Sequence, residues 1–415
     1  MVLVQQHKRR SSVHSEFLEL EGLALAAGAT VVARITAVRP APHPATFVGS
    51  GKAAEIASFV ESCHADLVIL DQAVTPVQER NLEAVVGCRV IDRSRLILDI
   101  FALRARTSEG KLQVELAQLS HLATRLVRGW THLERQRGGI GLRGPGETQL
   151  ETDRRLIGRR IRSLRTRISK VRSQRRLRRT RRERQSVPTV TLVGYTNSGK
   201  TSLFNELTGA GAFAADQLFA TLDPLMRKFE LEKFGGVILS DTVGFVSDLP
   251  HALVDAFHST LEEVTSSRLL LHVIDSSESD VEERIAHVEG VLFEIGAEKV
   301  PRLKVYNKSD LEADDEFGMP KRAHFDRGIR VSAKTGEGIQ RLCQMISQYL
   351  GQDRVERTLK IPPDCGRLRA RTYEIARVMS EDIDDEGNWW LRVVVDDTAV
   401  GKLEALDQFH SGLWC

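Results

Sequence analysis

A glycine-rich loop that ends in lysine and threonine constrains the fold of this chain more than any other feature. Residues 194–201 follow the apolar run Thr189–Val193 and precede Ser202–Leu207, which has helical character. In such a strand–loop–helix unit the loop amides bind phosphate oxygens, the lysine neutralises the outer phosphates and the last hydroxyl ligates Mg²⁺. The sequence therefore predicts a phosphate-binding corner in an α/β sheet. Its expected contacts are Gly194, Tyr195, Thr196, Asn197, Ser198, Gly199, Lys200, Thr201 and Ser202.

A second motif, further along the chain, selects the base of the nucleotide. The strands expected at Leu269–Asp275 and Lys304–Tyr306 are followed by Asn307-Lys308-Ser309-Asp310. The Asp310 carboxylate can accept hydrogen bonds from both N1–H and the exocyclic amine of guanine, whereas adenine offers no such pair of donors. We expect Asn307 to tie this loop to the phosphate loop and the stem of Lys308 to cover the base. A later loop should hold the guanine O6 through its backbone, and it contains Ser332, Ala333 and Lys334.

The residues between these motifs predict a magnesium site and two loops that respond to the γ-phosphate. Gly235–Gly236 should join strands at Lys228–Glu232 and Val237–Ser240 as a hairpin. The second strand leads to Asp241, which would hold Mg²⁺ through water, and to Gly244, whose amide would contact the γ-phosphate. The expected magnesium ligands are Thr201, Thr221 and Asp241. The expected catalytic residues are Lys200, Thr221 and Gly244.

The charge of the chain is concentrated in one segment. The whole chain has a net charge of +3, but residues 154–184 contain sixteen Lys or Arg and one acid, so this segment carries +15 and the rest −12. Apolar residues repeat at heptad spacing from Leu112 to Leu133 and from Ile157 to Val171, and the glycine-rich Gln136–Gly146 separates the two repeats. This pattern predicts an antiparallel helical hairpin. A second helix over residues 147–185 would be about 55 Å long.

A helix with so many like charges favours contact with a polyanion such as RNA. The alternatives are a solvated coiled-coil surface and a membrane-surface helix, although the segment has no Trp or Phe to act as a membrane anchor. The glycine-rich stretch is either a simple turn or a tip that enters folded RNA. The expected RNA contacts are Arg135, Arg137, Arg143, Arg175, Arg176, Arg178, Arg179, Arg181 and Arg182.

Four segments differ in pattern. We expect an N-terminal α/β domain at residues 1–103, the basic hairpin at 104–186, a P-loop G domain at 187–350 and a small α+β C-terminal domain at 351–415. The five cysteines are scattered and fit a reducing cytosol. The chain has no apolar run long enough to span a bilayer and no secretory signal, so we expect a cytoplasmic monomer without stable membrane insertion.

The guanine-site motifs resemble those of the translation-factor and Ras-like class of GTPases. Three further strings, Phe101–Thr107, Glu109–Leu116 and Gly138–Glu151, resemble signatures of the HflX family. Together the motifs cover most of residues 45–345 and are far more specific than a phosphate loop. The resemblance implies a Mg²⁺-dependent GTPase that binds the large (50S) ribosomal subunit and its rRNA and dissociates stalled or idle 70S ribosomes under stress. In that family the hairpin reaches towards the peptidyl-transferase centre.

Two other functions fit the same residues. One is a ribosome-assembly GTPase that acts on precursor 50S particles, and the other is a nucleotide-gated RNA-binding adaptor. The resemblance also leaves room for a secondary ATPase site at Gly49–Lys52, where a turn before a helix is the simpler interpretation, and for peripheral association with membranes.

The residue after Gly244 affects the expected rate of hydrolysis. Ras-like enzymes place a glutamine here that orients the attacking water, whereas this chain has Phe245, as the HflX resemblance implies. The sequence identifies no general base. We expect slow intrinsic hydrolysis that a partner accelerates.

Overall fold

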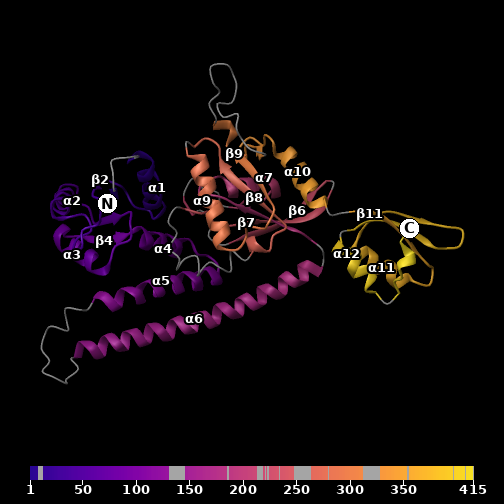
Figure 1. The fold of residues 1–415 in the computed structure, drawn as a ribbon, viewed down its shortest axis with the longest axis horizontal. Coiled ribbons are helices and arrows are strands. Elements are labelled where there is room, and N and C mark those ends of the chain that lie inside the picture. The colour runs from indigo at the N-terminus through magenta and orange to yellow at the C-terminus, as the bar shows by residue number, and fades with distance from the viewer. Residues whose placement is uncertain are drawn as a thin grey trace, which may run out of the picture.

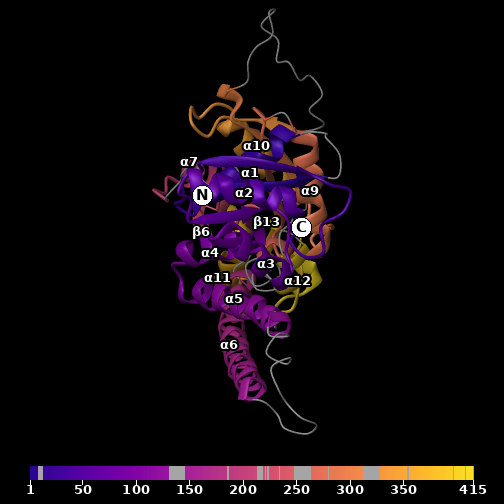
Figure 2. The same ribbon diagram turned by 90° about the vertical axis from the view of Figure 1, so that its left-hand side faces the viewer.

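The computed structural model describes residues 1–7, 13–129, 145–184, 187–212, 218–219, 221, 224–232, 234–246, 263–278, 280–311, 328–352, 355–395, 397–406 and 408–414. Side chains are not described at 13–16, 126–129, 145–150, 172, 175–176, 178–184, 397–398 and 411. Among the described residues there are three β-sheets, each with its own helices (Figure 1). Two long helices run beneath the N-terminal unit and the central unit (Figures 1 and 2).

The N-terminal unit is a parallel sheet with helices on both faces. The strand order is β2-β1-β3-β4, so the first strand lies inside the sheet. Helix α3 shows how local sequence sets an element: the Thr75 and Gln78 side chains form a capping box, and Gly87 ends the helix with φ 72°. The elements are β1 Val2–His7, α1 Val13–Ala26, β2 Ala33–Val38, α2 Ser50–Ser62, β3 Leu67–Leu70, α3 Pro76–Val86, β4 Arg89–Asp92 and α4 Arg93–Arg104.

The arm consists of helices α5 (Ser108–Gly129) and α6 (Pro145–Arg184), which lie side by side (Figure 1). They are antiparallel, because Leu112 near the start of α5 packs against Leu164 and Ile168 of α6, whereas Glu115, further along α5, pairs with Arg160, which comes earlier in α6. An ion pair of 2.6 Å between Arg160 and Glu115 lies beside this seam. At 1.5 Å per residue the 40 residues of α6 span about 60 Å.

A buried ion cluster fixes the arm to the N-terminal unit. Arg125 of α5 pairs with Glu79 of α3 and, at 2.5 Å, with Asp92 at the end of β4. Asp92 also accepts a hydrogen bond from the Arg95 amide and so caps α4. Asp92 is buried and the other two side chains are mostly covered, so loss of one partner would leave a charge with little solvent to compensate it. The cluster therefore holds α5 in place.

The central unit is a sheet with the order β10-β9-β8-β5-β7-β6, in which β6 is antiparallel to β7 and the other pairs are parallel. The strand β5 lies between β8 and β7 near the centre of this sheet, so the glycine-rich loop that follows it lies at the middle of one sheet edge. The elements are β5 Thr189–Val193, α7 Lys200–Thr208, β6 Leu225–Leu231, β7 Gly235–Asp241, β8 Leu269–Asp275, α9 Val281–Glu294, β9 Arg302–Asn307, η2 Ser309–Leu311, β10 Gly328–Arg330 and α10 Ile339–Gly351.

The C-terminal unit is an antiparallel sheet with the order β11-β13-β12. Leu359, Leu391 and Val393 point to one face of it and pack with Leu368 and Leu403 of the helices. The elements are β11 Val355–Ile361, α11 Gly366–Ile375, β12 Arg377–Ile383, β13 Trp389–Val395, α12 Asp397–Glu404 and η3 Ser411–Leu413. Within the described ranges, no helix combines the length and the apolarity needed to cross a bilayer.

The predicted fold class is confirmed: an N-terminal α/β unit, a helical hairpin, a P-loop sheet and a small α+β unit. Two local expectations were wrong. Gly235–Gly236 belong to β7, and the turn of the hairpin lies just before them. Pro145 and Gly146 begin α6 instead of belonging to the break, because proline is compatible with the first turn of a helix. The rest of the break lies outside the described residues.

Candidate nucleotide-binding site

The glycine-rich loop connects β5 to α7 through backbone conformations that need glycine. Gly194 has φ 151° and Gly199 has φ 85°. A Cβ atom on Gly194 would lie 2.2 Å from the carbonyl oxygen of Val273, and one on Gly199 would lie 2.2 Å from Nδ2 of Asn307. Both glycines therefore permit close approach to the neighbouring strands, and the loop backbone can curve around a phosphate group.

A cavity of about 550 Å³ lies at this corner, large enough for a nucleotide. It brings together most of the residues predicted from the sequence. Those that line it are Thr196, Asn197, Gly199, Lys200, Thr201, Ser202, Thr221, Gly244, Asn307, Lys308, Asp310, Ala333 and Lys334. The other predicted residues lie beside or behind it: Gly194, Tyr195, Ser198, Asp241 and Ser332.

Lys200 lies at the phosphate end of the cavity. Its ammonium donates hydrogen bonds to the carbonyl oxygens of Tyr195 at 2.6 Å and Gly194 at 3.2 Å. Burial lowers the pKa of Lys200 to about 8, although the nearby Asp241 carboxylate acts in the opposite direction. A phosphate group here would supply the negative charge that this buried cation lacks.

Three oxygen-bearing side chains converge beside Lys200. The Thr201 hydroxyl donates to Oδ2 of Asp241 at 2.8 Å, and it lies 2.7 Å from the hydroxyl of Thr221. Oδ1 of Asp241 is buried and has no hydrogen-bond partner among the described atoms, and burial raises the pKa of this carboxyl. A small group of hard oxygen ligands with an unpaired buried carboxylate oxygen fits Mg²⁺. These are the three residues that the sequence predicts as its ligands.

At the base end the four-residue motif organises the cavity wall. Asn307 donates from Nδ2 to the carbonyl of Ser198 at 2.9 Å and accepts from the Ala333 amide at 3.0 Å. The Ser332 hydroxyl donates to Oδ1 of Asp310 at 2.6 Å, which orients that carboxylate. Asn307 therefore links the loop that carries Ala333 to the phosphate loop, as the sequence predicts for this side chain.

The side chains of Lys308 and Phe245 make contacts that the sequence did not predict. The ammonium of Lys308 pairs with Asp275 at 2.7 Å, which holds the lysine stem along the base end. Phe245 is 2% exposed and packs in the core with Tyr195 and Leu270, so its ring points away from the cavity. This side chain has no hydrogen-bonding group that could orient an attacking water.

A contact between the phosphate loop and the N-terminal unit was not predicted from the sequence. The Tyr195 hydroxyl donates to Glu19 of α1 at 2.6 Å, and Arg93 of α4 pairs with both Glu19 and Asp71. Arg284 of α9 stacks over the Tyr195 ring at 4.9 Å. Tyr195 and Glu19 are 176 residues apart, so no local pattern could have indicated their contact.

His272 lies behind the loop on β8, next to Val193 and Lys304 in the sheet. It is 1% exposed, and its Nδ1 has no hydrogen-bond partner among the described atoms. Burial, followed by the charges of Lys304 and Arg302, lowers its pKa to about 3. The folded chain therefore resists protonation here, whereas an unfolded histidine takes up a proton near pH 6.5.

We expect His272 to make the central unit less stable as the pH falls below about 6.5, a loss that continues down to about pH 3. At pH 5 the loss should be about 2 kcal/mol relative to pH 7. Thermal and urea unfolding at the two pH values should show that His272→Gln removes this dependence. His410→Gln, at an exposed position, is the matched control. An equal pH dependence in all three proteins would contradict the assignment.

The predicted RNA contacts lie largely beyond the described atoms. Arg135, Arg137 and Arg143 fall in undescribed residues, as do the side chains of Arg175, Arg176, Arg178, Arg179, Arg181 and Arg182. On the described part of α6, an exposed basic surface is present nonetheless. It consists of Arg154, Arg155, Arg159, Arg160, Arg162, Arg165, Arg167 and Lys170. We call these eight residues the basic face of the arm.

Four family models match consecutive parts of the chain. A GTP-binding GTPase N-terminal model matches residues 14–102, and a GTP-binding GTPase middle-region model matches 104–182. A model described as 50S ribosome-binding GTPase matches 189–308, and an HflX C-terminal domain model matches 319–406.

Proteins named GTPase HflX are similar in sequence to this chain over nearly its whole length. GTPase HflX of Escherichia coli strain K12 is 51% identical over 399 residues, which cover 94% of this chain and 92% of the relative. GTPase HflX of Caldanaerobacter subterraneus subsp. tengcongensis is 46% identical and covers 89% of this chain and 85% of the relative. A crystal structure of a GTP-binding protein from Sulfolobus solfataricus with GDP aligns over 85% of this chain and 99% of that chain, at 26% identity and a TM-score of 0.44.

Proposed function

Because the chain belongs to the HflX family of GTPases, we propose that it binds the large ribosomal subunit and dissociates stalled or idle 70S ribosomes, with its GTP state controlling how the basic arm docks on rRNA. The matching family model over residues 189–308 is that of a 50S ribosome-binding GTPase. The observation that carries the proposal is the arm itself: a helix of 40 residues with an exposed basic face, packed along α5.

In this proposal each residue of the cavity has a separate task. Lys200 binds the β- and γ-phosphates, and the amide of Gly244 donates to the γ-phosphate. Thr201, Thr221 and Asp241 hold Mg²⁺, which when bound offsets the negative charge of the phosphate oxygens. Asp310 reads the guanine edge. Since Thr221 and Gly244 lie on different loops, the γ-phosphate orders both loops only while it is attached.

The arm supplies the contact with the ribosome. The basic face is solvent-exposed over residues 154–170. Arg160 of this face pairs with Glu115 of α5. Release of counterions from a polyanion favours binding to such a surface and makes that binding depend on salt. The buried cluster around Arg125 would pass force or movement between the arm and the N-terminal unit without a flexible joint.

Light scattering of purified 70S ribosomes tests the proposal directly. Addition of the protein with GTP or a non-hydrolysable analogue should convert 70S particles to free subunits, whereas GDP should not. Lys200→Ala should abolish dissociation because it no longer binds the triphosphate. Intact 70S particles together with GTP-dependent binding to precursor 50S particles would indicate an assembly factor. RNA affinity and cellular activity that survive in Lys200→Ala would indicate an adaptor.

Neutralising part of the basic face should flatten the salt dependence of ribosome binding. We expect Arg155→Gln, Arg159→Gln and Arg162→Gln together to reduce the slope of log affinity against log salt by about 0.7 to 0.9 for each phosphate that the variant no longer neutralises. The matched control replaces three arginines of the C-terminal unit, Arg367, Arg371 and Arg377, by glutamine. Equal slopes in the arm variant and the wild type would show that the helix is only a solvated surface.

A further inference from the structure

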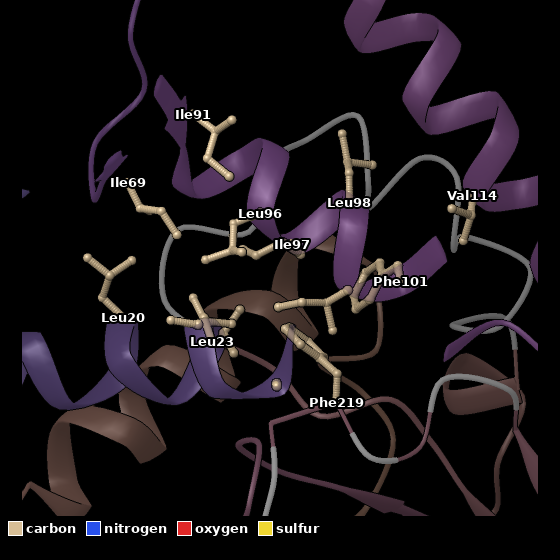
Figure 3. Close-up of a cluster of buried hydrophobic side chains, with 14 of the residues drawn as sticks. Leu20, Leu23, Ile69, Ile91, Leu96, Ile97, Leu98, Phe101, Val114 and Phe219 are labelled. Atoms are coloured by element: carbon tan, nitrogen blue, oxygen red, sulfur yellow. The ribbon is translucent and has the colours of Figure 1, made fainter. Parts of the chain in front are cut away.

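Phe219 connects the nucleotide cavity to the core of the N-terminal unit. It lies two residues before Thr221, on the chain segment that enters the cavity, and it also lines the cavity. Its side chain is 2% exposed and belongs to a cluster formed by helices α1, α4 and α5 (Figure 3). This residue of the central unit is therefore buried mainly by residues of another unit.

The contacts around Phe219 are specific in geometry. Its ring meets Phe101 of α4 edge to face, with 4.6 Å between centroids and 82° between planes. Leu23 of α1 lies beside the two rings (Figure 3). The preceding residue, Leu218, packs where Gly22 has no side chain, since a Cβ there would lie 3.0 Å from Leu218 Cδ1. Edge-to-face pairs of this kind are attractive beyond the burial of their apolar surface, because the positive edge of one ring meets the negative face of the other.

The backbone of Phe219 is held in an unfavourable conformation. Its φ is 57°, in the left-handed region that bulky residues rarely adopt. Such a conformation is energetically unfavourable and persists only where surrounding contacts enforce it. Here the enforcing contacts come from α1 and α4, so the N-terminal unit determines the path of the chain as it approaches Thr221.

The position of Phe219 limits where Thr221 can lie. Two residues of chain span at most about 7 Å, so a fixed Phe219 keeps the Thr221 hydroxyl near Thr201 and Asp241. Val243 and Val246, from the loop that carries Gly244, pack in the same cluster. Both loops that face the γ-phosphate position thus share one apolar support, which lies outside the nucleotide-binding unit.

We propose that Phe219 is a positioning residue for Thr221, and that the N-terminal unit holds it in the conformation that binds magnesium and the triphosphate. This inference rests on the proposed role of Thr221 as a magnesium ligand. Val114 and Ala117 of α5, at the base of the arm, lie in the same cluster. Triphosphate binding and the seating of the arm therefore stabilise one another, and by linkage each strengthens the other equally.

Phe219→Ala and Phe101→Leu test the contact from its two sides. Both should weaken binding of a non-hydrolysable GTP analogue, about tenfold for Phe219→Ala and less for Phe101→Leu, and raise the Mg²⁺ concentration needed for that binding. GDP affinity should stay within about twofold, because only the triphosphate state orders these loops. A general loss of structure would lower both affinities. Phe101→Leu changes no atom of the central unit, so its effect must pass through the contact.

The controls separate this inference from the site assignment. Phe293→Ala, at an α9 position that is 71% exposed, should leave both affinities unchanged. Phe219→Leu should restore part of the analogue affinity. If Thr221→Ala weakens analogue binding but Phe219→Ala and Phe101→Leu do not, the site stands and this inference is wrong. If Thr221→Ala has no effect on the Mg²⁺ requirement, the proposed magnesium site fails as well. A melting curve for each variant confirms that it is folded.

Discussion

Replacement of Asp310 by asparagine should weaken GTP binding by about 10²- to 10³-fold and make xanthosine triphosphate the better ligand. In the proposed site the carboxylate accepts two hydrogen bonds from guanine, and its Oδ1 is oriented by the Ser332 hydroxyl at 2.6 Å. An asparagine would present an NH₂ donor to guanine donors and leave them unpaired in a partly closed site. Xanthine, which has a carbonyl in place of the exocyclic amine, suits that amide.

Titration calorimetry with Mg²⁺ present measures both affinities. Asp66→Asn, an exposed change of the same kind in the N-terminal unit, is the matched control and should bind GTP as the wild type does. Ser332→Ala should cause a smaller loss, since it only loosens the carboxylate. Unchanged GTP affinity in Asp310→Asn would remove the basis for assigning guanine to this cavity.

Replacement of Gly244 by alanine should reduce GTP hydrolysis by about 10²- to 10³-fold, comparable to the loss of one donor that stabilises a transition state. A Cβ at this position would lie 2.7 Å from Cα of Thr196 and 3.0 Å from the Lys200 ammonium. The two loops are joined here by hydrogen bonds from the Thr196 amide to Phe245 and from the Phe245 amide to Gly194, at 2.7 and 3.1 Å. The methyl group must push them apart, which withdraws the residue 244 amide from the γ-phosphate position.

Single-turnover hydrolysis, with and without ribosomes, is the appropriate measurement. Gly290→Ala is the matched control, because this glycine lies inside α9 and a Cβ there would meet nothing within 4 Å. That variant should hydrolyse GTP at the wild-type rate and gain about 0.5–1 kcal/mol of stability, as expected for alanine in a helix. Equal hydrolysis by both variants would show that residue 244 is not close to the reacting phosphate.

The strands of the central unit could be predicted from the sequence because each nucleotide-binding motif directly follows a strand. The ranges Thr189–Val193 and Leu269–Asp275 agree with the structure, since short segments rich in apolar and β-branched residues are typical of buried parallel strands. The first strand, Val2–His7, was not predicted, although it lies inside the N-terminal sheet. Its sequence is apolar for only three residues and then polar, and its central place follows from pairing with two distant strands.

The residues around the cavity could be chosen from the sequence because each has a type that its chemistry requires. Glycines allow the close approaches at Gly194 and Gly199, and a carboxylate at Asp310 can match guanine. The residues that pack behind the cavity could not be predicted from the sequence in this way. Phe101 and Phe219, or Glu19 and Tyr195, are ordinary residues of their types and have no spacing that relates them.

The sequence alone determined which groups this protein offers for its chemistry: a phosphate loop, a carboxylate that can match guanine and a strongly basic helix, because these depend on residue type and on short spacings along the chain. Only the tertiary structure decided what packs behind the loops of the cavity, since Phe219 and Tyr195 find their partners more than one hundred residues away, in another unit. Contacts over such distances arise from the packing of whole sheets and helices, and packing leaves no local signal in the chain.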